Sequence, residues 1–117
     1  MVTSVGTEEQ ALDIAHTLVR RQLAACVNIV PGVRSVFRWK GKVQQESELM
    51  LVIKTLAEHY DAVTAVIREL NAYELPEIVA FAPRVVDRAF GAWVAESSTG
   101  VPADDDDEDE PGEATID

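Results

Sequence analysis

The sequence lacks most of the features that mark secreted, membrane and disulfide-bonded proteins. Its single cysteine, Cys26, excludes an intrachain disulfide in a chain of 117 residues. The first ten residues, MVTSVGTEEQ, contain neither a basic segment nor an apolar run, so we expect no signal peptide. No apolar run approaches the roughly 20 residues of a membrane-spanning helix. We therefore expect a cytoplasmic protein with no membrane as a partner.

Positive charge is scarce toward the C-terminus. No Lys or Arg follows Arg88, whereas nine of the 21 acidic residues lie between 104 and 117. Residues 1–103 thus carry 12 acids (21 less nine) against 10 bases, so most of the net charge of −11 belongs to the end of the chain. Such a run repels itself and has nothing to bury, which predicts a disordered acidic tail over 100–117 after one domain over 1–99. Without a basic stripe, we expect no nucleic-acid partner.

The common catalytic and cofactor signatures are also missing. No P-loop, no GxGxxG and no CxxC occurs. Nucleophilic catalysis by Cys26 needs a positioned base, but His16 and His59 fall on predicted helices far from it in the sequence. Both histidines are expected at the solvated surface. The sequence therefore argues against an enzyme and against an obligatory cofactor.

Hydrophobic periodicity predicts the element order β-α-β-β-α-β-α. A capping box of Thr7 and Gln10 starts a helix over about 8–22, and a second one, Thr55 with Glu58, starts a helix that reaches about residue 71. Between them, two long strands form a hairpin that bends or bulges at Pro31-Gly32 and turns at Gly41. After them, IVAFA predicts a short buried strand, and a final short helix carries the apolar residues Val86, Phe90, Trp93 and Val94.

This order is the split βαβ, or ferredoxin-like, α+β fold with a long hairpin and an extra C-terminal helix. Right-handed crossovers place both main helices on one face of the sheet. A monomer would then show a polar opposite face, but LMLVI and CVNIV are apolar on both faces. The pattern therefore predicts an oligomer in which another copy covers the second face.

Four landmarks, in order and at matching spacing, closely resemble the CutA family of divalent-cation tolerance proteins: LAAC-N-PG at 23–32, S-F-W-G at 35–41, E-x6-IKT at 46–55, and Y-x2-PE at 73–77. The resemblance runs from about Thr3 to Trp93. It implies a homotrimer of ferredoxin-like subunits, built like the PII signalling proteins. It also implies a role in tolerance of copper and other divalent metal ions, with no defining catalytic reaction.

The resemblance further implies a cleft between subunits. Cys26 is its expected metal ligand, and the expected small-ligand contacts are Trp39, Lys54, Tyr73 and Glu77. This chain departs from the family at two positions. Asn71-Ala72 stands where relatives often have His-Pro, and Thr3 stands where some relatives carry another Cys. Both departures remove soft or borderline metal ligands.

Each of these residues also has a structural interpretation. Cys26 is better explained as a small core residue and Trp39 as an interface anchor, whereas Lys54 is equally explained as a lysine that extends its stem along apolar surface. Tyr73 and Glu77 are equally explained as residues that fix their loop. Glu46 and Glu48 offer hard oxygen ligands, although glutamates at a strand start are usually solvated. An alternative function is a PII-like regulator that acts through protein partners.

Overall fold

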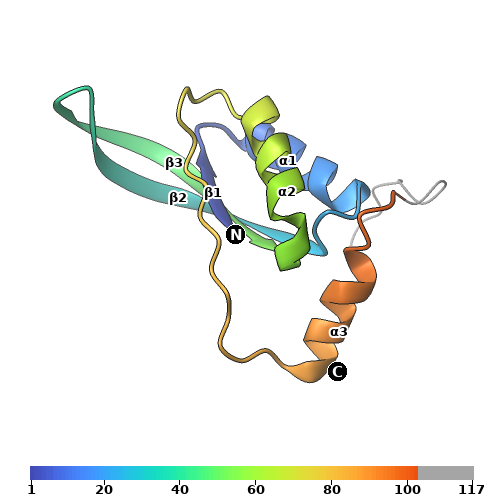
Figure 1. The fold of residues 1–117 in the computed structure, drawn as a ribbon. Helices are drawn as coiled ribbons and strands as arrows, with labels where there is room; N and C mark the ends of the chain where they lie inside the picture. The colour runs from blue at the N-terminus through green and yellow to red at the C-terminus, as the bar shows by residue number, and fades with distance from the viewer. Residues whose placement is uncertain (103–117) are drawn as a thin grey trace.

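The computed structural model describes residues 1–102, in which a twisted sheet lies against two helices (Figure 1). The elements are β1 (Val2–Val5), α1 (Glu8–Arg20), β2 (Cys26–Trp39), β3 (Lys42–Lys54), the 3-10 turn η1 (Ala57–His59), α2 (Tyr60–Leu70) and α3 (Arg88–Ser97). Most of the predicted acidic tail, from residue 103 on, lies outside the described residues. No helix of the described part is long and apolar enough to cross a membrane.

The sheet is antiparallel with strand order β1-β3-β2. β2 and β3 form the predicted long hairpin, which extends beyond the helices (Figure 1). Its turn is confirmed at Lys40-Gly41, where both φ angles are positive, at 50° and 78°. Two successive positive φ angles are typical of the tight turn that suits the twist of a hairpin. The predicted bulge is confirmed as well, because the pairing register shifts between Val30 and Val33.

The bulge decides which side chains share a face of the hairpin. Before it, Cys26 pairs with Lys54 and Val30 with Met50, so even-numbered residues of both strands lie together. After it, odd-numbered residues of β2, such as Phe37, pair with even-numbered residues of β3. The shift therefore brings Phe37 and Trp39 onto the same face as Cys26.

The core lies between the opposite face of the sheet and the two helices, as predicted. α1 and α2 bury one stripe each against the strands, in a cluster that includes Ile14, Leu18, Leu51, Ile53, Val63 and Ile67. The first predicted capping box is half formed: the Thr7 hydroxyl accepts from the Gln10 amide at 3.2 Å, but the Gln10 side chain accepts from the Ala72 amide instead. α1 is thereby linked to the segment that follows α2.

Two local predictions were wrong. Thr55 does not cap α2, because its hydroxyl donates to the Leu23 carbonyl at 2.6 Å, and no side chain caps η1. The IVAFA segment is not a buried strand. It meets the sheet through one isolated bridge, between Val79 and Val2, and Phe81 is 71% exposed. Since β1 has only four residues and bonds to the segment at one position, there is too little pairing to hold a strand.

Among residues 1–102, no helix covers the second face of the sheet. In Figure 1 both long helices lie on one side of the sheet, and α3 stands away from it with Val94 as its buried residue. Large apolar side chains remain exposed on the chain that leads to α3 and on α3 itself, namely Val79, Phe81, Val85, Val86, Phe90 and Trp93. One described chain therefore leaves two apolar surfaces uncovered.

Candidate functional site

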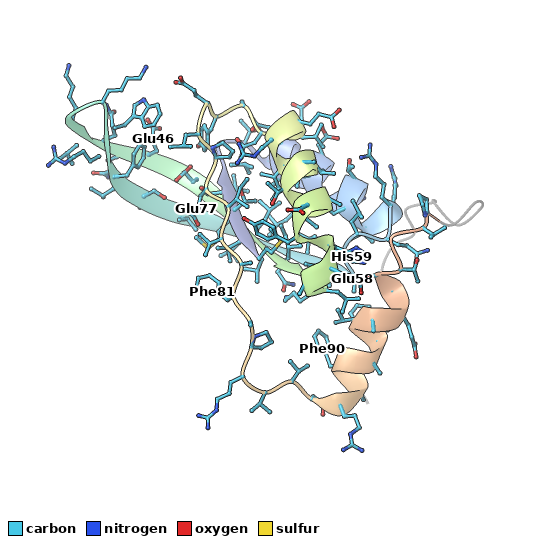
Figure 2. The ribbon with its side chains drawn as sticks, viewed as in Figure 1. Glu46, Glu58, His59, Glu77, Phe81 and Phe90 are labelled. Atoms are coloured by element: carbon cyan, nitrogen blue, oxygen red, sulfur yellow. The ribbon has the colours of Figure 1, made fainter. Side chains whose placement is uncertain are left out.

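A groove of about 830 Å³ lies between the outer part of the hairpin and the loop that follows α2. We call it the hairpin groove. Its floor is the hairpin face that carries Phe37, Trp39, Glu46 and Glu48, and its wall is the loop over residues 72–77. Figure 2 labels Glu46 on the hairpin and Glu77 on the loop beyond it. The bulge matters here, because without the register shift the two aromatic side chains would lie on the other face.

The best-defined contact of the groove joins its floor to its wall. The Tyr73 hydroxyl donates to Glu48 Oε2 at 2.6 Å. Burial raises the pKa of Tyr73 far above its usual value of 10.0, and the hydrogen bond to Glu48 adds to the rise. Tyr73 therefore keeps its proton and remains a hydrogen-bond donor throughout the physiological pH range.

Asn71 holds this loop in place. Its Nδ2 donates to the Ser4 carbonyl at 3.0 Å, and its Oδ1 accepts from the Tyr73 amide at 3.0 Å. The side chain is buried, and the bond to Ser4 in particular is shielded from competing water. Asn71 thus fixes β1 and the loop relative to each other and positions the phenol to reach Glu48.

Cys26 and Lys54 lie apart from the groove. They face each other as a cross-strand pair at the end of the sheet opposite the hairpin tip, and neither lines the groove. Both are partly exposed, and Cys26 is a free thiol. The five implied site residues therefore lie in two groups: Trp39, Tyr73 and Glu77 line the groove, whereas Cys26 and Lys54 lie outside it.

Other candidate metal ligands do not gather near Cys26. Thr3 is fully buried and pairs with Leu51 on the helix-covered face. His59 was expected at the solvated surface, which is wrong: it is half-buried, and its Nε2 lies 2.5 Å from the Ser98 carbonyl. Among residues 1–102, no three His, Cys, Asp or Glu side chains are arranged to hold a metal ion.

The rim of the groove at the hairpin tip is partly neutralised. The Lys40 ammonium lies 3.8 Å from Glu74, and both side chains are largely exposed. The same ammonium lies 5.6 Å from the centre of the Trp39 ring, in the range of a cation–π contact.

Deeper in the groove, the expectation of a solvated Glu48 was wrong, since this residue is only 7% exposed. The one feature of the sequence that could have indicated the burial of Glu48 is its position directly before the apolar run of β3.

Residues 1–97 match the family described as "CutA1 divalent ion tolerance protein". The chain belongs to the CutA1 family. The match confirms the resemblance that the four landmarks predicted, and it covers every described helix and strand.

CutA proteins from distant organisms are similar to this chain. The divalent-cation tolerance protein CutA of Thermus thermophilus is 39% identical over 98 residues, which are 84% of this chain and 95% of that protein. Human Protein CutA is 34% identical over 94 residues, 80% of this chain, but the chain spans only about half (52%) of the human protein.

Solved CutA structures confirm the α+β fold class. The Thermus thermophilus structure superposes with a TM-score of 0.81, covering 83% of this chain and 94% of that one. The CutA structure from Xylella fastidiosa is 33% identical with a TM-score of 0.80, covering 83% of this chain and 93% of that one. A CutA structure from Archaeoglobus fulgidus, described as periplasmic, has a TM-score of 0.80 at 31% identity.

Proposed function

We propose that this CutA-family chain works as a homotrimer in the response to divalent metal ions. In this proposal it binds a metal ion such as copper, or a small ligand, in clefts between subunits, and it catalyses no reaction. The single cysteine supports action in the reducing cytoplasm. The family supports the link to divalent cations, and the proposal adds the assembly and the clefts.

One observation supports the assembly: the sheet has an apolar face that no helix of residues 1–102 covers. That face presents Val2, Val30, Met50 and Val52 beside Cys26, and Val30 is 44% exposed. Soluble monomers rarely leave contiguous apolar patches of this kind uncovered. Covering the face with other copies removes it from water, and the exposed residues around Phe81 and Phe90 extend the area available for contact.

The clefts follow from the assembly. Within one chain, the Cys26 and Lys54 pair lies apart from the hairpin groove. A single site that combines this pair with the groove residues therefore requires two subunits. A thiol is a soft ligand suited to copper(I). Because each subunit supplies one thiol with a repelling lysine across the strand, we expect copper binding to be weak.

The assembly is tested by light scattering at micromolar concentration. The wild-type chain is expected at three times the subunit mass. Val30→Glu places a charge on the open sheet face and is expected to give monomers. Leu12→Glu is the matched control, because Leu12 on α1 is similarly exposed, at 42%, and that variant is expected to stay trimeric. A monomeric wild type would refute the proposed assembly.

The metal site is tested by calorimetric titration of copper into wild type and Cys26→Ala under matched reducing conditions. The expected result is weak binding in the wild type and none in the variant, with the trimer mass unchanged. The truncation should cost on the order of 1 kcal/mol of stability, because it leaves only a small cavity. Equal binding by both proteins would place the copper site elsewhere.

A further inference from the structure

The hairpin groove contains a buried negative charge that the described chain does not neutralise. Glu48 is more than nine-tenths buried, and its Oε2 is bonded to Tyr73. Its other oxygen accepts no hydrogen bond from residues 1–102, and no basic side chain among them pairs with Glu48. That oxygen is not among the sealed polar atoms of the interior, so it is reachable from the groove. Buried charges are usually paired, because removing an unpaired charge from water is costly.

The surroundings of this carboxylate indicate what would neutralise it. Glu46 and Glu77 also line the groove, and Glu74 at the rim already pairs with Lys40. Figure 2 shows Glu46 and Glu77 on the two sides, hairpin and loop. The charge of the groove therefore favours a cation.

The aromatic side chains favour an organic cation. Phe37, Trp39 and Tyr73 line the same groove, and the indole of Trp39 already receives the ammonium of Lys40 at 5.6 Å. A hard metal ion needs six or more oxygen ligands in a defined arrangement, whereas no described trio of ligating side chains is in place. An organic ammonium needs only one or two acceptors, with aromatic surface for its alkyl part.

We propose that the hairpin groove binds a small organic cation with a primary ammonium group. The ammonium donates to the free oxygen of Glu48, and the alkyl chain lies along Phe37 and Trp39. The volume of about 830 Å³ falls within the usual range of small-molecule sites, about 300–1,000 Å³. This inference rests on the proposed function in one respect: it names the chemical class of ligand for the groove side of the cleft.

The test uses the full chain and n-hexylamine as the probe in calorimetric titration at pH 7, where a primary amine is protonated. n-Hexanol is the neutral control of equal length. The amine is expected to bind at least about tenfold more tightly than the alcohol, as a charge-assisted hydrogen bond implies. Equal binding of amine and alcohol by the wild type would overturn the proposal, whatever the behaviour of any variant.

Two variants locate the site. Glu48→Gln keeps the shape and an acceptor for Tyr73 but removes the charge, and it is expected to weaken hexylamine binding by about 10- to 100-fold. Glu74→Gln is the matched control, since Glu74 lines the same groove but is exposed and already paired; its effect should stay below about twofold. Equal losses in the two variants would show that only general acidity matters and would overturn the proposal.

Two further outcomes count against it. If magnesium or copper binds the wild type, displaces hexylamine and loses affinity in Glu48→Gln, the groove is a metal site. If hexylamine binds Val30→Glu monomers but not the wild-type trimer, a basic side chain of a second copy fills the groove. Light scattering on the same samples separates this proposal from the proposed assembly. A wild-type trimer that does not bind hexylamine would refute only the ligand proposal. A wild-type monomer that binds hexylamine would refute only the proposed trimer.

Discussion

Replacing Tyr73 by phenylalanine removes one oxygen atom and the bond between the floor and wall of the groove. That bond is short, 2.6 Å, and its acceptor is the buried Glu48 carboxylate. Hydrogen bonds to charged groups contribute about 1.5–3 kcal/mol. Tyr73 is 36% exposed, however, so in the variant a water molecule can take the place of the hydroxyl and restore part of the lost hydrogen-bond energy. We therefore expect Tyr73→Phe to lower the free energy of unfolding by about 1 kcal/mol.

The assay is urea or thermal unfolding at fixed protein concentration, because self-association makes the melting temperature depend on concentration. A loss of about 1 kcal/mol corresponds to a drop of roughly 4–8 °C for a domain of this size. Tyr60→Phe is the matched control. Tyr60 is 40% exposed, and its hydroxyl makes no hydrogen bond within the described residues. An equal change in the two variants would refute the reasoning, because loss of the Glu48 bond would then not be the cause.

The pKa of Tyr73 adds a pH signature. The folded-state pKa lies above the ordinary value of 10.0, so folding favours the protonated phenol. The stabilisation is complete below pH 10, where both states keep the proton, and is lost as the pH rises and the unfolded state ionises first. The stability difference between wild type and Tyr73→Phe should therefore shrink above pH 10. A difference that stays constant or grows there would contradict the assigned donor role.

Three further changes test the fold. Gly32→Ala should cost about 1 kcal/mol because Gly32 has a φ of +74°, whereas Gly32→Asn should cost less; equal melting temperatures would refute the role of the bulge conformation. Leu51→Ala should cost about 2–5 kcal/mol in urea unfolding, because Leu51 is fully buried, and Leu12→Ala should cost under about 1 kcal/mol; a small loss at Leu51 would disprove the core assignment. His59→Phe removes the bond to the Ser98 carbonyl, which follows α3, so hydrogen exchange at the Gly100 amide should accelerate. Unchanged exchange would show that the His59 contact does not hold the segment after α3 in place.

The helices and the hairpin could be predicted because their signals are local. The stripe that contains Ile14 and Leu18 repeats with helical spacing, and the structure buries both residues. The turn at Gly41 and the bulge after Pro31 depend on the backbone preferences of glycine and proline, which neighbouring sequence expresses directly. Predictions failed where a side chain had more than one partner available. Thr55 stands at a position typical of a helix cap, but its hydroxyl donates instead to the carbonyl of Leu23, which is remote in the sequence.

The candidate site could be predicted only in part. The landmarks pointed to Trp39, Tyr73 and Glu77, which line one groove, and also to Cys26 and Lys54, which lie at the other end of the sheet. Periodicity assigns a residue to a face but does not measure the distance between two positions on that face. Glu48 was underestimated for a related reason: its burial is created by a loop that begins more than twenty residues later in the chain.

By itself, then, the sequence determined the element order, the hairpin with its kink and the apolar character of both sheet faces, because each is expressed in the spacing and type of neighbouring residues. Only the tertiary structure decided that IVAFA runs along a short edge strand with Phe81 exposed, that the bulge turns Trp39 to the face of Cys26, and that Tyr73 donates a hydrogen bond to Glu48 across the groove. These features depend on strand register and on the path of a loop across it, and both are set by contacts between segments far apart in the chain.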